Sequence, residues 1–455
     1  MSTKEERLWQ ACTDGDLALV KTLTVEEGLE INWADPERNR TSFYRAVHFG
    51  HKDVVDFLMG DPRVDITIQH VEGHTPFCKA CLEGHTEIVL LLARDPRVVV
   101  TEPLKSGASP FLMACEFSRP EVVRLLQADP RIDVNLPDDR SVSPVFVACE
   151  RGFLPVVQLL LADPRVDLNA LTKEEVTPFS AACENGHAEV VRLLLARPEV
   201  DVVRADSAGL RPLFVACQND HVGVVKLLLA DDRTQINVGI PDGATAFYIA
   251  CERGLLATTT VMLEDPRVDI NQAKQNQSTP LWIATQNGNL DVVRIMFASD
   301  RLVNTQLVST FNNTTAAQQG GNMTLAGQFP LETEEFYQRR KTCCPLIVDL
   351  IEKYEDDPDA TRVTVRRLPK IRDYYSSRLF ALLVFVSDGL LKMPGAREGT
   401  GNEERFFGIC GRLPLELQML LCNRAYRSAR EIISTKTSEE AFRWLAKTLL
   451  WDLTA

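Results

Sequence analysis

Residues 177–210 read TPFSAACENGHAEVVRLLLARPEVDVVRADSAGL, and close copies of this stretch recur along much of the 455-residue chain. Aligned on their first residue, the copies begin 34 residues apart, with no insertion or deletion between them. They start at Thr41, Thr75, Ser109, Ser143, Thr177, Arg211, Thr245 and Thr279. A period between about 20 and 50 residues is typical of a solenoid, in which equal units stack on one another.

Each unit is predicted to contain two short helices. A hydroxyl followed by proline, as in Thr177-Pro178, is a helix start, because the hydroxyl caps the first amides and proline lacks an amide that would need a partner. The first helix ends at a glycine such as Gly186. The second helix ends at a recurrent DPRVD stretch, as at residues 163–167, because proline cannot continue it. Helices this short cannot bury their apolar faces alone, so the units must pack on one another.

The strings TPFCKACLEGHTEIVLLLA from Thr75 and TPFSAACENGHAEVVRLLLA from Thr177 resemble the ankyrin repeat, whose pattern is T-P-L-H-x-A-A, then G-H, then V-V-x-L-L-L. The chain departs from that pattern by a period of 34 residues where the family has about 33. It also lacks the histidine of the first helix and has cysteine in place of the second alanine. The extra residue falls in the DPRVD loop, so we expect a longer turn and intact stacking.

We predict an all-α fold in three parts. Residues 1–308 form the ankyrin-repeat array, with a divergent first unit at 1–40 and a final repeat at 279–306. Residues 309–330 are uncharged, rich in Asn, Thr, Gln and Gly, and indicate a flexible linker or surface loop. Residues 331–455 have no repeat and are predicted to form a separate helical domain of unrecognised family.

The helices of the C-terminal domain are predicted from apolar spacing and capping residues. The first spans about Glu332 to Lys353, interrupted or restarted at Pro345, and the next starts at Asp357-Pro358, with a strand over residues 363–365 as the alternative. Further helices are expected over residues 374–391, over residues 414–433, and after Thr437, where Glu440 completes the spacing of a capping box.

The net charge of −13 is unevenly distributed. From residue 331 onward there are 20 Lys+Arg and 19 Asp+Glu, so the first 330 residues carry −14. An acidic array is a poor partner for nucleic acid, because binding to phosphates depends on Lys and Arg displacing counterions. A basic protein or peptide fits better, although surplus acid can also simply keep a long array soluble.

The cysteines do not indicate a disulfide framework or a metal site. Stacked helices lie about 8–10 Å apart, whereas a disulfide needs Cα atoms within about 4.4–6.8 Å. We therefore expect this repeated position to be a small packing residue between helices. Six of the cysteines occupy it in successive repeats: Cys81, Cys115, Cys149, Cys183, Cys217 and Cys251.

Sequence patterns of catalysis are also missing. There is no HExxH, GxSxG or Walker loop. The Cys78–Cys81 pair has no second pair with which to complete a zinc site, and Cys343-Cys344 have no nearby histidine base. We predict a protein that is not an enzyme and has no cofactor, metal or small-molecule substrate.

No apolar run approaches the roughly 20 residues of a membrane helix, and the start MSTKEERLWQ does not resemble a secretory signal. We therefore expect a monomer without membrane partners, located in the cytoplasm or, as the alternative, in the nucleus.

The resemblance to ankyrin repeats implies a binding surface on the concave side, built from hairpin tips and exposed positions of the first helices. The implied tip residues are Glu72, His74, Arg140, Lys173, Val176 and Leu210. The implied residues at the ends of the first helices are Phe49, Glu83, Glu116, Phe117, Glu150, Arg151, Glu184, Gln218, Glu252 and Arg253. These positions vary while the core positions repeat, and several put apolar groups where water is expected. The glutamates could instead serve only solvation.

The preferred hypothesis is a non-enzymatic interaction scaffold or adaptor that binds a protein or peptide, with a basic one fitting the charge. The alternative is a substrate adaptor of a ubiquitin ligase. It rests on residues 413–422, LPLELQMLLC, which are similar to the start of an F-box; ankyrin arrays are also coupled to SOCS boxes in such ligases. A proline-initiated core helix produces the same string.

Overall fold

The computed structural model describes residues 3–310, 314–322, 334–366, 368 and 371. The chain divides into two compact units, Met1–Ile249 and Ala250–Ala455, with the boundary inside α15 (Ala246–Arg253). The described residues form helices and no strand beyond two isolated β-bridges, Ala34 with Thr41 and Ser309 with Thr314. The prediction of an all-α fold of repeated helix pairs is confirmed for this part of the chain.

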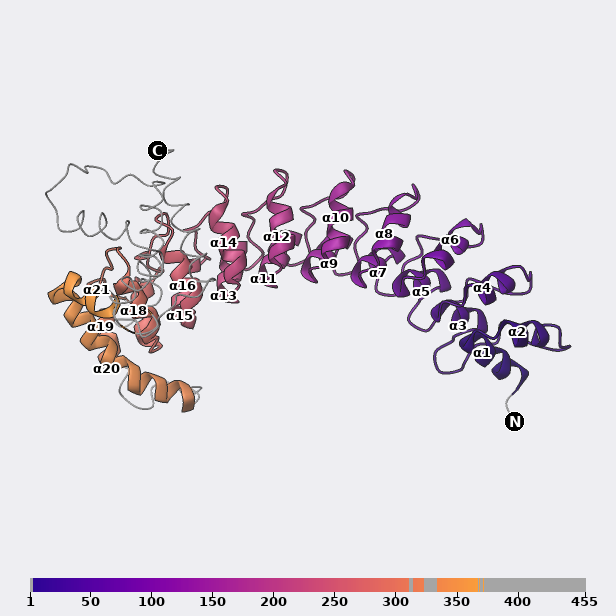
Figure 1. Cartoon of the computed structure of the whole chain (residues 1–455), viewed down its shortest axis with the longest axis horizontal. Coiled ribbons are helices and arrows are strands. Elements are labelled where there is room, and N and C mark those ends of the chain that lie inside the picture. The colour runs from indigo at the N-terminus through magenta and orange to yellow at the C-terminus, as the bar shows by residue number, and fades with distance from the viewer. Residues whose placement is uncertain (1–2, 311–313, 323–333, 367, 369–370, 372–455) are drawn as a thin grey trace, which may run out of the picture. The chain divides into compact units, whose positions relative to one another are not determined.

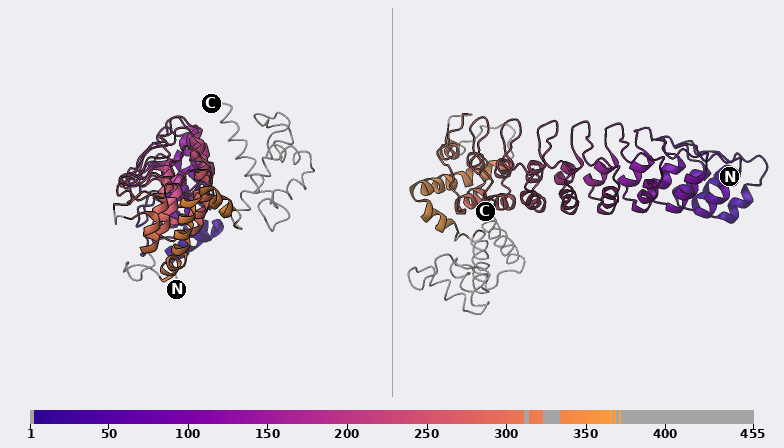
Figure 2. Two further views of the ribbon diagram at one scale, coloured as in Figure 1. Left: turned by 90° about the vertical axis from the view of Figure 1, so that its left-hand side faces the viewer. Right: turned by 90° about the horizontal axis from the view of Figure 1, so that it is seen from above.

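The N-terminal unit is a row of helix pairs that stand side by side in chain order (Figure 1). The first helices of the pairs are α1 (Lys4–Asp14), α3 (Ser42–His48), α5 (Pro76–Glu83), α7 (Pro110–Glu116), α9 (Pro144–Glu150), α11 (Pro178–Glu184) and α13 (Pro212–Gln218). The second helices are α2 (Leu17–Leu23), α4 (Lys52–Met59), α6 (Thr86–Arg94), α8 (Pro120–Gln127), α10 (Leu154–Ala162), α12 (Ala188–Leu195) and α14 (Val222–Ala230). The loops that connect consecutive pairs project to the same side of the row (Figure 2).

The first helices begin as the sequence predicts. The Thr177 hydroxyl accepts a hydrogen bond from the Ser180 amide at 3.0 Å, and Ser109 accepts one from the Leu112 amide at 3.1 Å. Arg211 occupies the same position without a side-chain cap. In the repeats that have it, the hydroxyl-proline sequence therefore starts the first helix through contacts within a few residues.

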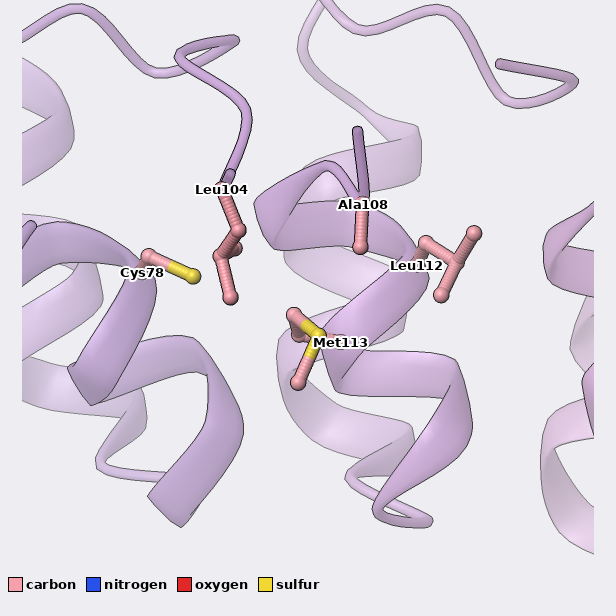
Figure 3. Packing of buried hydrophobic residues seen from close by; sticks show 5 residues of the cluster. All are labelled: Cys78, Leu104, Ala108, Leu112 and Met113. Carbon is pink, nitrogen blue, oxygen red and sulfur yellow. The ribbon is translucent and has the colours of Figure 1, made fainter. Parts of the chain in front are cut away.

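Apolar side chains fill the space between consecutive pairs. Phe77, Phe111 and Phe179 occupy the same position in their repeats, and each is 1 % exposed. Figure 3 shows how a hairpin takes part in the packing: Cys78 of α5 points toward Leu104 of the following hairpin, with Met113 of α7 beneath. Each repeat thus completes the core of its neighbour, as a solenoid requires.

The recurrent DPR arginines connect each second helix to the next repeat. Arg131 pairs with Asp129 at 2.6 Å, and its Nη2 also donates to the Ala93 carbonyl oxygen, 2.9 Å away in α6. The guanidinium therefore binds a carbonyl at the end of the preceding second helix, where the helix dipole favours a positive charge. Arg63, Arg97, Arg165 and Arg233 donate in the same way to Thr24, Met59, Gln127 and Leu195. Arg197, which stands at the position of the aspartate in its own loop, donates to Leu161.

We expect Arg131→Ala to lower the free energy of unfolding by about 1–2 kcal/mol. The substitution removes a charged donor, and the carbonyl oxygen at the helix end would then accept hydrogen bonds from water alone. Arg124→Ala is the matched control, since Arg124 makes only an exposed pair with Glu121 at 3.5 Å, which is worth less than about 0.5 kcal/mol. Urea unfolding of the two variants measures the difference. Equal losses would contradict the role given to Arg131.

Asparagines form a second connection in the same loop. Asn135 Nδ2 donates to the Arg165 carbonyl oxygen at 2.7 Å, and its Oδ1 accepts from the Asp167 amide at 2.8 Å. Asn32 and Asn169 make the equivalent pair of bonds to the loops that follow them. The longer DPRVD turn is therefore a regular element of the stack, and stacking is intact as expected.

Histidines at the start of the second helices form a third connection. His187 Nε2 donates to the Glu150 carbonyl oxygen at 2.8 Å, and His221 Nε2 donates to that of Glu184 at 2.8 Å. His51 and His85 do the same toward Thr13 and His48. These four histidines therefore cap the preceding first helix and have a structural role.

In the C-terminal unit, three helices pack against the last repeat. That repeat consists of α17 (Pro280–Gln286) and α18 (Leu290–Ala298), after α16 (Leu256–Leu263). The helices α19 (Ala316–Asn322), α20 (Glu334–Asp356) and α21 (Pro358–Arg366) follow, with α19 against α17 and α20, and α21 against α18 (Figure 1). Tyr354 stacks on Phe297 with ring centroids 4.3 Å apart, and the Cys344 thiol donates to the Thr285 carbonyl oxygen at 3.3 Å.

Two predictions for this region are wrong. Residues 309–330 contain the helix α19, so they are not wholly a loop. Residues 334–366 pack on the final repeat, where Phe297, Met296 and Ile295 are buried, and the division of the chain into three domains stays a prediction. The helix α20 continues through Pro345 without interruption, whereas the helix predicted to start at Asp357-Pro358 is confirmed as α21 and includes residues 363–365. The helices predicted over 374–391, over 414–433 and after Thr437 lie outside the described residues. None of the described helices has the length and apolarity to cross a membrane.

Candidate interaction surface

The tips of successive hairpins are joined by backbone hydrogen bonds. The Lys105 amide donates to the Glu72 carbonyl oxygen at 3.4 Å, and the Ser207 amide donates to that of Glu174 at 2.9 Å. Similar bonds join Val71 to Arg38 and Asp139 to Ser106. Of the tip residues implied by the sequence, Glu72, Arg140 and Lys173 are exposed, and His74, Val176 and Leu210 are partly buried.

The residues that close the first helices form what we call the helix-end row. In the N-terminal unit it contains Phe49, Glu83, Glu116, Phe117, Glu150, Arg151, Glu184 and Gln218. Phe49 and Phe117 close α3 and α7 and are 44 % and 41 % exposed. Glu150, Arg151 and Glu184 are exposed, and the remaining three are partly buried. Glu252 and Arg253 hold the same position in the C-terminal unit, one partly buried and one exposed.

Charged contacts along this row join neighbouring repeats. Arg151 Nη2 lies 2.7 Å from Glu116 Oε1 of the preceding repeat. Glu83 pairs with Lys79 at 2.7 Å in its own helix, and lies 3.5 Å from His48 Nε2 of the preceding repeat. Cations therefore partly neutralise the carboxylates of Glu83 and Glu116. Within the described residues the carboxylates of Glu150 and Glu184 form no ion pair, and their backbone carbonyl oxygens accept from histidines of the next repeat.

Five aromatic rings connect the helix-end row to the hairpin tips, and we call them the aromatic cluster: Tyr44, His48, Phe49, His70 and His74. His48 stacks on Phe49 with centroids 4.6 Å apart, and Tyr44 stacks on His70 at 5.8 Å. His70 and His74 meet edge to face at 5.9 Å. The cluster links Phe49 and His74, which were implied from different parts of the repeat, through the buried rings of Tyr44 and His70.

Sequence reasoning missed Tyr44, His48 and His70. His48 and His70 occupy positions where the other repeats have different residues, and Tyr44 occupies a core position that only the repeat of Tyr248 also fills with tyrosine, so the repeat pattern gave no reason to select them. The available signal was the concentration of histidine, because four of the seven in the chain lie between residues 48 and 74. The three in the cluster make none of the carbonyl caps that occupy the other four through Nε2.

Burial keeps the cluster histidines neutral. It lowers the pKa of His48 to about 4, with the Lys79 ammonium adding to the effect and Glu83 opposing it. Burial is also the main cause of the lowered pKa of His70 and of His74. In the described part of the chain, Nδ1 of His48 and Nδ1 of His74 are buried without a hydrogen-bond partner. Protonating either ring would leave a buried charge.

We expect the His48 pKa to lie near 4 in a proton NMR titration of the folded chain, and near 6.5 after unfolding in urea. A base with a lowered folded pKa binds more protons when unfolded, so its contribution to stability falls as pH decreases from about 6.5 toward 4. His48→Gln should therefore make stability less sensitive to pH in this window. A folded-state midpoint near 6.5 would contradict the burial argument.

The cysteines of the array are poorly suited to act as nucleophiles or metal ligands. All six at the repeated position are buried, as the sequence predicts. Burial raises the pKa of the Cys149 thiol to about 12 and moves those of the others upward where a shift is resolved. Within the described ranges, no group of three or more His, Cys, Asp or Glu side chains is placed to hold a metal ion. The F-box-like residues 413–422 lie outside these ranges.

Comparison with protein families agrees with the helix-pair geometry. The family model described as "Ankyrin repeats (3 copies)" matches residues 8–102, 43–138, 145–240 and 231–306, which together exceed half of the chain. The region beyond residue 306 matches no family model. No curated protein matches the chain significantly.

Proposed function

The chain belongs to the ankyrin-repeat family, and from this premise we propose that it is a scaffold or adaptor that binds a partner protein through the helix-end row and the aromatic cluster. Ankyrin repeats are protein-interaction modules and bind protein partners. Proteins of this family are in general not enzymes. The proposal adds a surface, a partner chemistry and a role to that general function.

The observation that favours this surface is the exposure of Phe49 and Phe117 in a row of otherwise polar or charged residues. Aromatic side chains surrounded by polar groups are typical of interaction sites, where they provide most of the binding energy. The two rings close the first helices of the second and fourth pairs in the chain, so one partner segment could contact both.

The partner is proposed to be basic. Glu150 and Glu184 are exposed carboxylates in the row, and the first 330 residues have a net charge of −14. Opposite charge at the rim of an interface increases the association rate and selects among partners more than it increases affinity. We therefore expect binding to weaken and to slow as the salt concentration rises.

The test compares proteins captured from a lysate by the full chain and by two variants. Phe49→Ser with Phe117→Ser removes the exposed rings of the row. Leu90→Ser with Val99→Ser is the control, since both residues are exposed apolar side chains outside the row. We expect a partner held by the wild type and the control to fall about tenfold with the row variant. Equal capture by all three chains would reject the surface.

The ubiquitin-ligase alternative rests only on residues 413–422. It predicts that a cullin-linker protein copurifies with the chain and is lost when Leu413 and Leu415 are changed to alanine. Cytoplasmic location and a monomeric state also remain proposals, which imaging of a tagged chain and light scattering would test.

A further inference from the structure

A groove of about 730 Å³ lies at the N-terminal end of the array, between α1 and the first hairpin, residues 33–40. Its lining includes Trp9, Leu19, Trp33 and Pro36, and carboxylates of both elements. Asp14 lies in it directly before Gly15, at the place that Phe49 takes before Gly50 in the next repeat. The helix-end row, extended to the first unit, would therefore reach this groove at Asp14.

The walls of this groove are already adapted to cations. The Arg45 guanidinium carbon lies 4.2 Å from the centre of the Trp9 ring system, and that of Arg40 lies 5.5 Å from it. Arg40 also pairs with Asp35 at 2.8 Å. Arg40 thus combines an indole face with a carboxylate, which is how a cation is held in a partly dry site, while Arg45 contacts the same indole from outside the groove lining. Trp33, on the same groove, repeats the indole component.

The charge lining the groove is unbalanced. The lining contains five carboxylates and two arginines; these are Glu6, Asp14, Asp16, Asp35 and Glu37, and Arg7 and Arg40. Asp35 is occupied by Arg40, and Asp16 caps α2 by accepting from the Leu19 amide at 2.9 Å. Asp14 Oδ1 accepts from Gln10 Nε2 at 2.9 Å, and Glu37 has no ion pair within the described residues. Negative potential therefore remains beside the tryptophans.

We propose that this groove binds an extended basic segment of a partner protein, with an arginine or lysine side chain lying on Trp33 between Asp14 and Glu37. Charge complementarity selects this occupant: an acidic segment would meet the surplus carboxylates, and a purely apolar one would leave them desolvated. A second copy of the chain, with a net charge of −13, fits poorly. The site goes beyond the helix-end row and does not depend on that row being an interface.

The experiment titrates the full chain with a hexa-arginine peptide by calorimetry at about 0.15 M salt, with hexa-glutamate as the comparison probe. Two variants address the groove: Trp33→Ala, and the uncharged pair Asp14→Asn with Glu37→Gln. The control pair Glu121→Gln with Glu189→Gln removes the same charge from exposed side chains on second helices. Thermal melting monitors folding, and the charge-neutral pair decides the matter if Trp33→Ala does not fold.

We expect both groove variants to weaken hexa-arginine binding about five- to tenfold, since one cation–π contact or a pair of ionic contacts is lost. The control pair should change it less than about twofold, and hexa-glutamate should not bind. Equal weakening by the control pair would show diffuse attraction and overturn the proposal, as would unchanged binding by the groove variants. Loss only in the Phe49→Ser, Phe117→Ser chain would assign the peptide to the row. A groove variant that altered self-association instead would identify a second copy as the occupant.

Discussion

Ending the chain after residue 308 should expose the last repeat and destabilise it by several kcal/mol. Phe297 and Met296 are fully buried and Ile295 is 4 % exposed in the intact chain, and the burial of each such side chain contributes about 2 kcal/mol. The truncation removes α19, α20 and α21, which pack against that repeat. It also removes Arg362 and Arg366, whose Nε atoms donate to the Ser299 and Ala298 carbonyl oxygens at 2.9 and 2.8 Å.

Hydrogen exchange detected by mass spectrometry tests this expectation. Amides in residues 279–306 should exchange far faster in the chain ending at 308 than in the full chain, because a terminal repeat needs a polar outer face. A chain ending after residue 371 is the control, since it keeps α19 to α21 and should retain protection. Equal protection in the two truncated chains would show that the added helices do not cap the array.

Gly186→Ala should cost about 2–3 kcal/mol. Gly186 has φ +76°, where a side chain costs about 1–2 kcal/mol. An added Cβ would also lie 2.5 Å from His221 Nδ1. His221 would have to move, and its 2.8 Å hydrogen bond to the Glu184 carbonyl oxygen contributes about a further 1 kcal/mol. The connection between two consecutive repeats would therefore weaken along with the turn itself.

Gly223→Ala is the control for this change. Gly223 lies inside α14, and an added Cβ would meet nothing closer than Ala188 Cβ at 3.8 Å. Alanine is favoured over glycine in a helix interior by about 0.5–1 kcal/mol, so this variant should be more stable than the wild type. Urea unfolding measures both. Two variants that shift in the same direction would contradict the turn argument.

The elements that depend on local sequence could be predicted. Thr177 caps its helix with its own hydroxyl, and Arg131 pairs with an aspartate two residues away. Because such contacts span a few residues, the repeat spacing predicted both the helix pairs and the buried cysteines. The exposure of Phe49 and Phe117 followed from the same register, which placed them just beyond the core positions.

Contacts between repeats were decided only by tertiary structure. Arg151 binds Glu116 of the preceding repeat rather than its sequence neighbour, and within one repeat Tyr44 stacks on His70 of the hairpin that follows α4. Residues 316–322, AAQQGGN, have no apolar face and suggest a loop, yet they form α19. An added Cβ on Gly320 would lie 2.8 Å from both Thr285 and Val348, so its missing side chain allows α19 to fit between α17 and α20.

The sequence by itself determined that the array is built of equal helix pairs, because caps, turns and apolar spacing act within one repeat. The tertiary structure alone decided which side chains meet across repeats, how the last repeat is covered and where the N-terminal groove lies. Those features depend on surfaces that become neighbours only after the pairs have stacked, so no local pattern of residues could predict them.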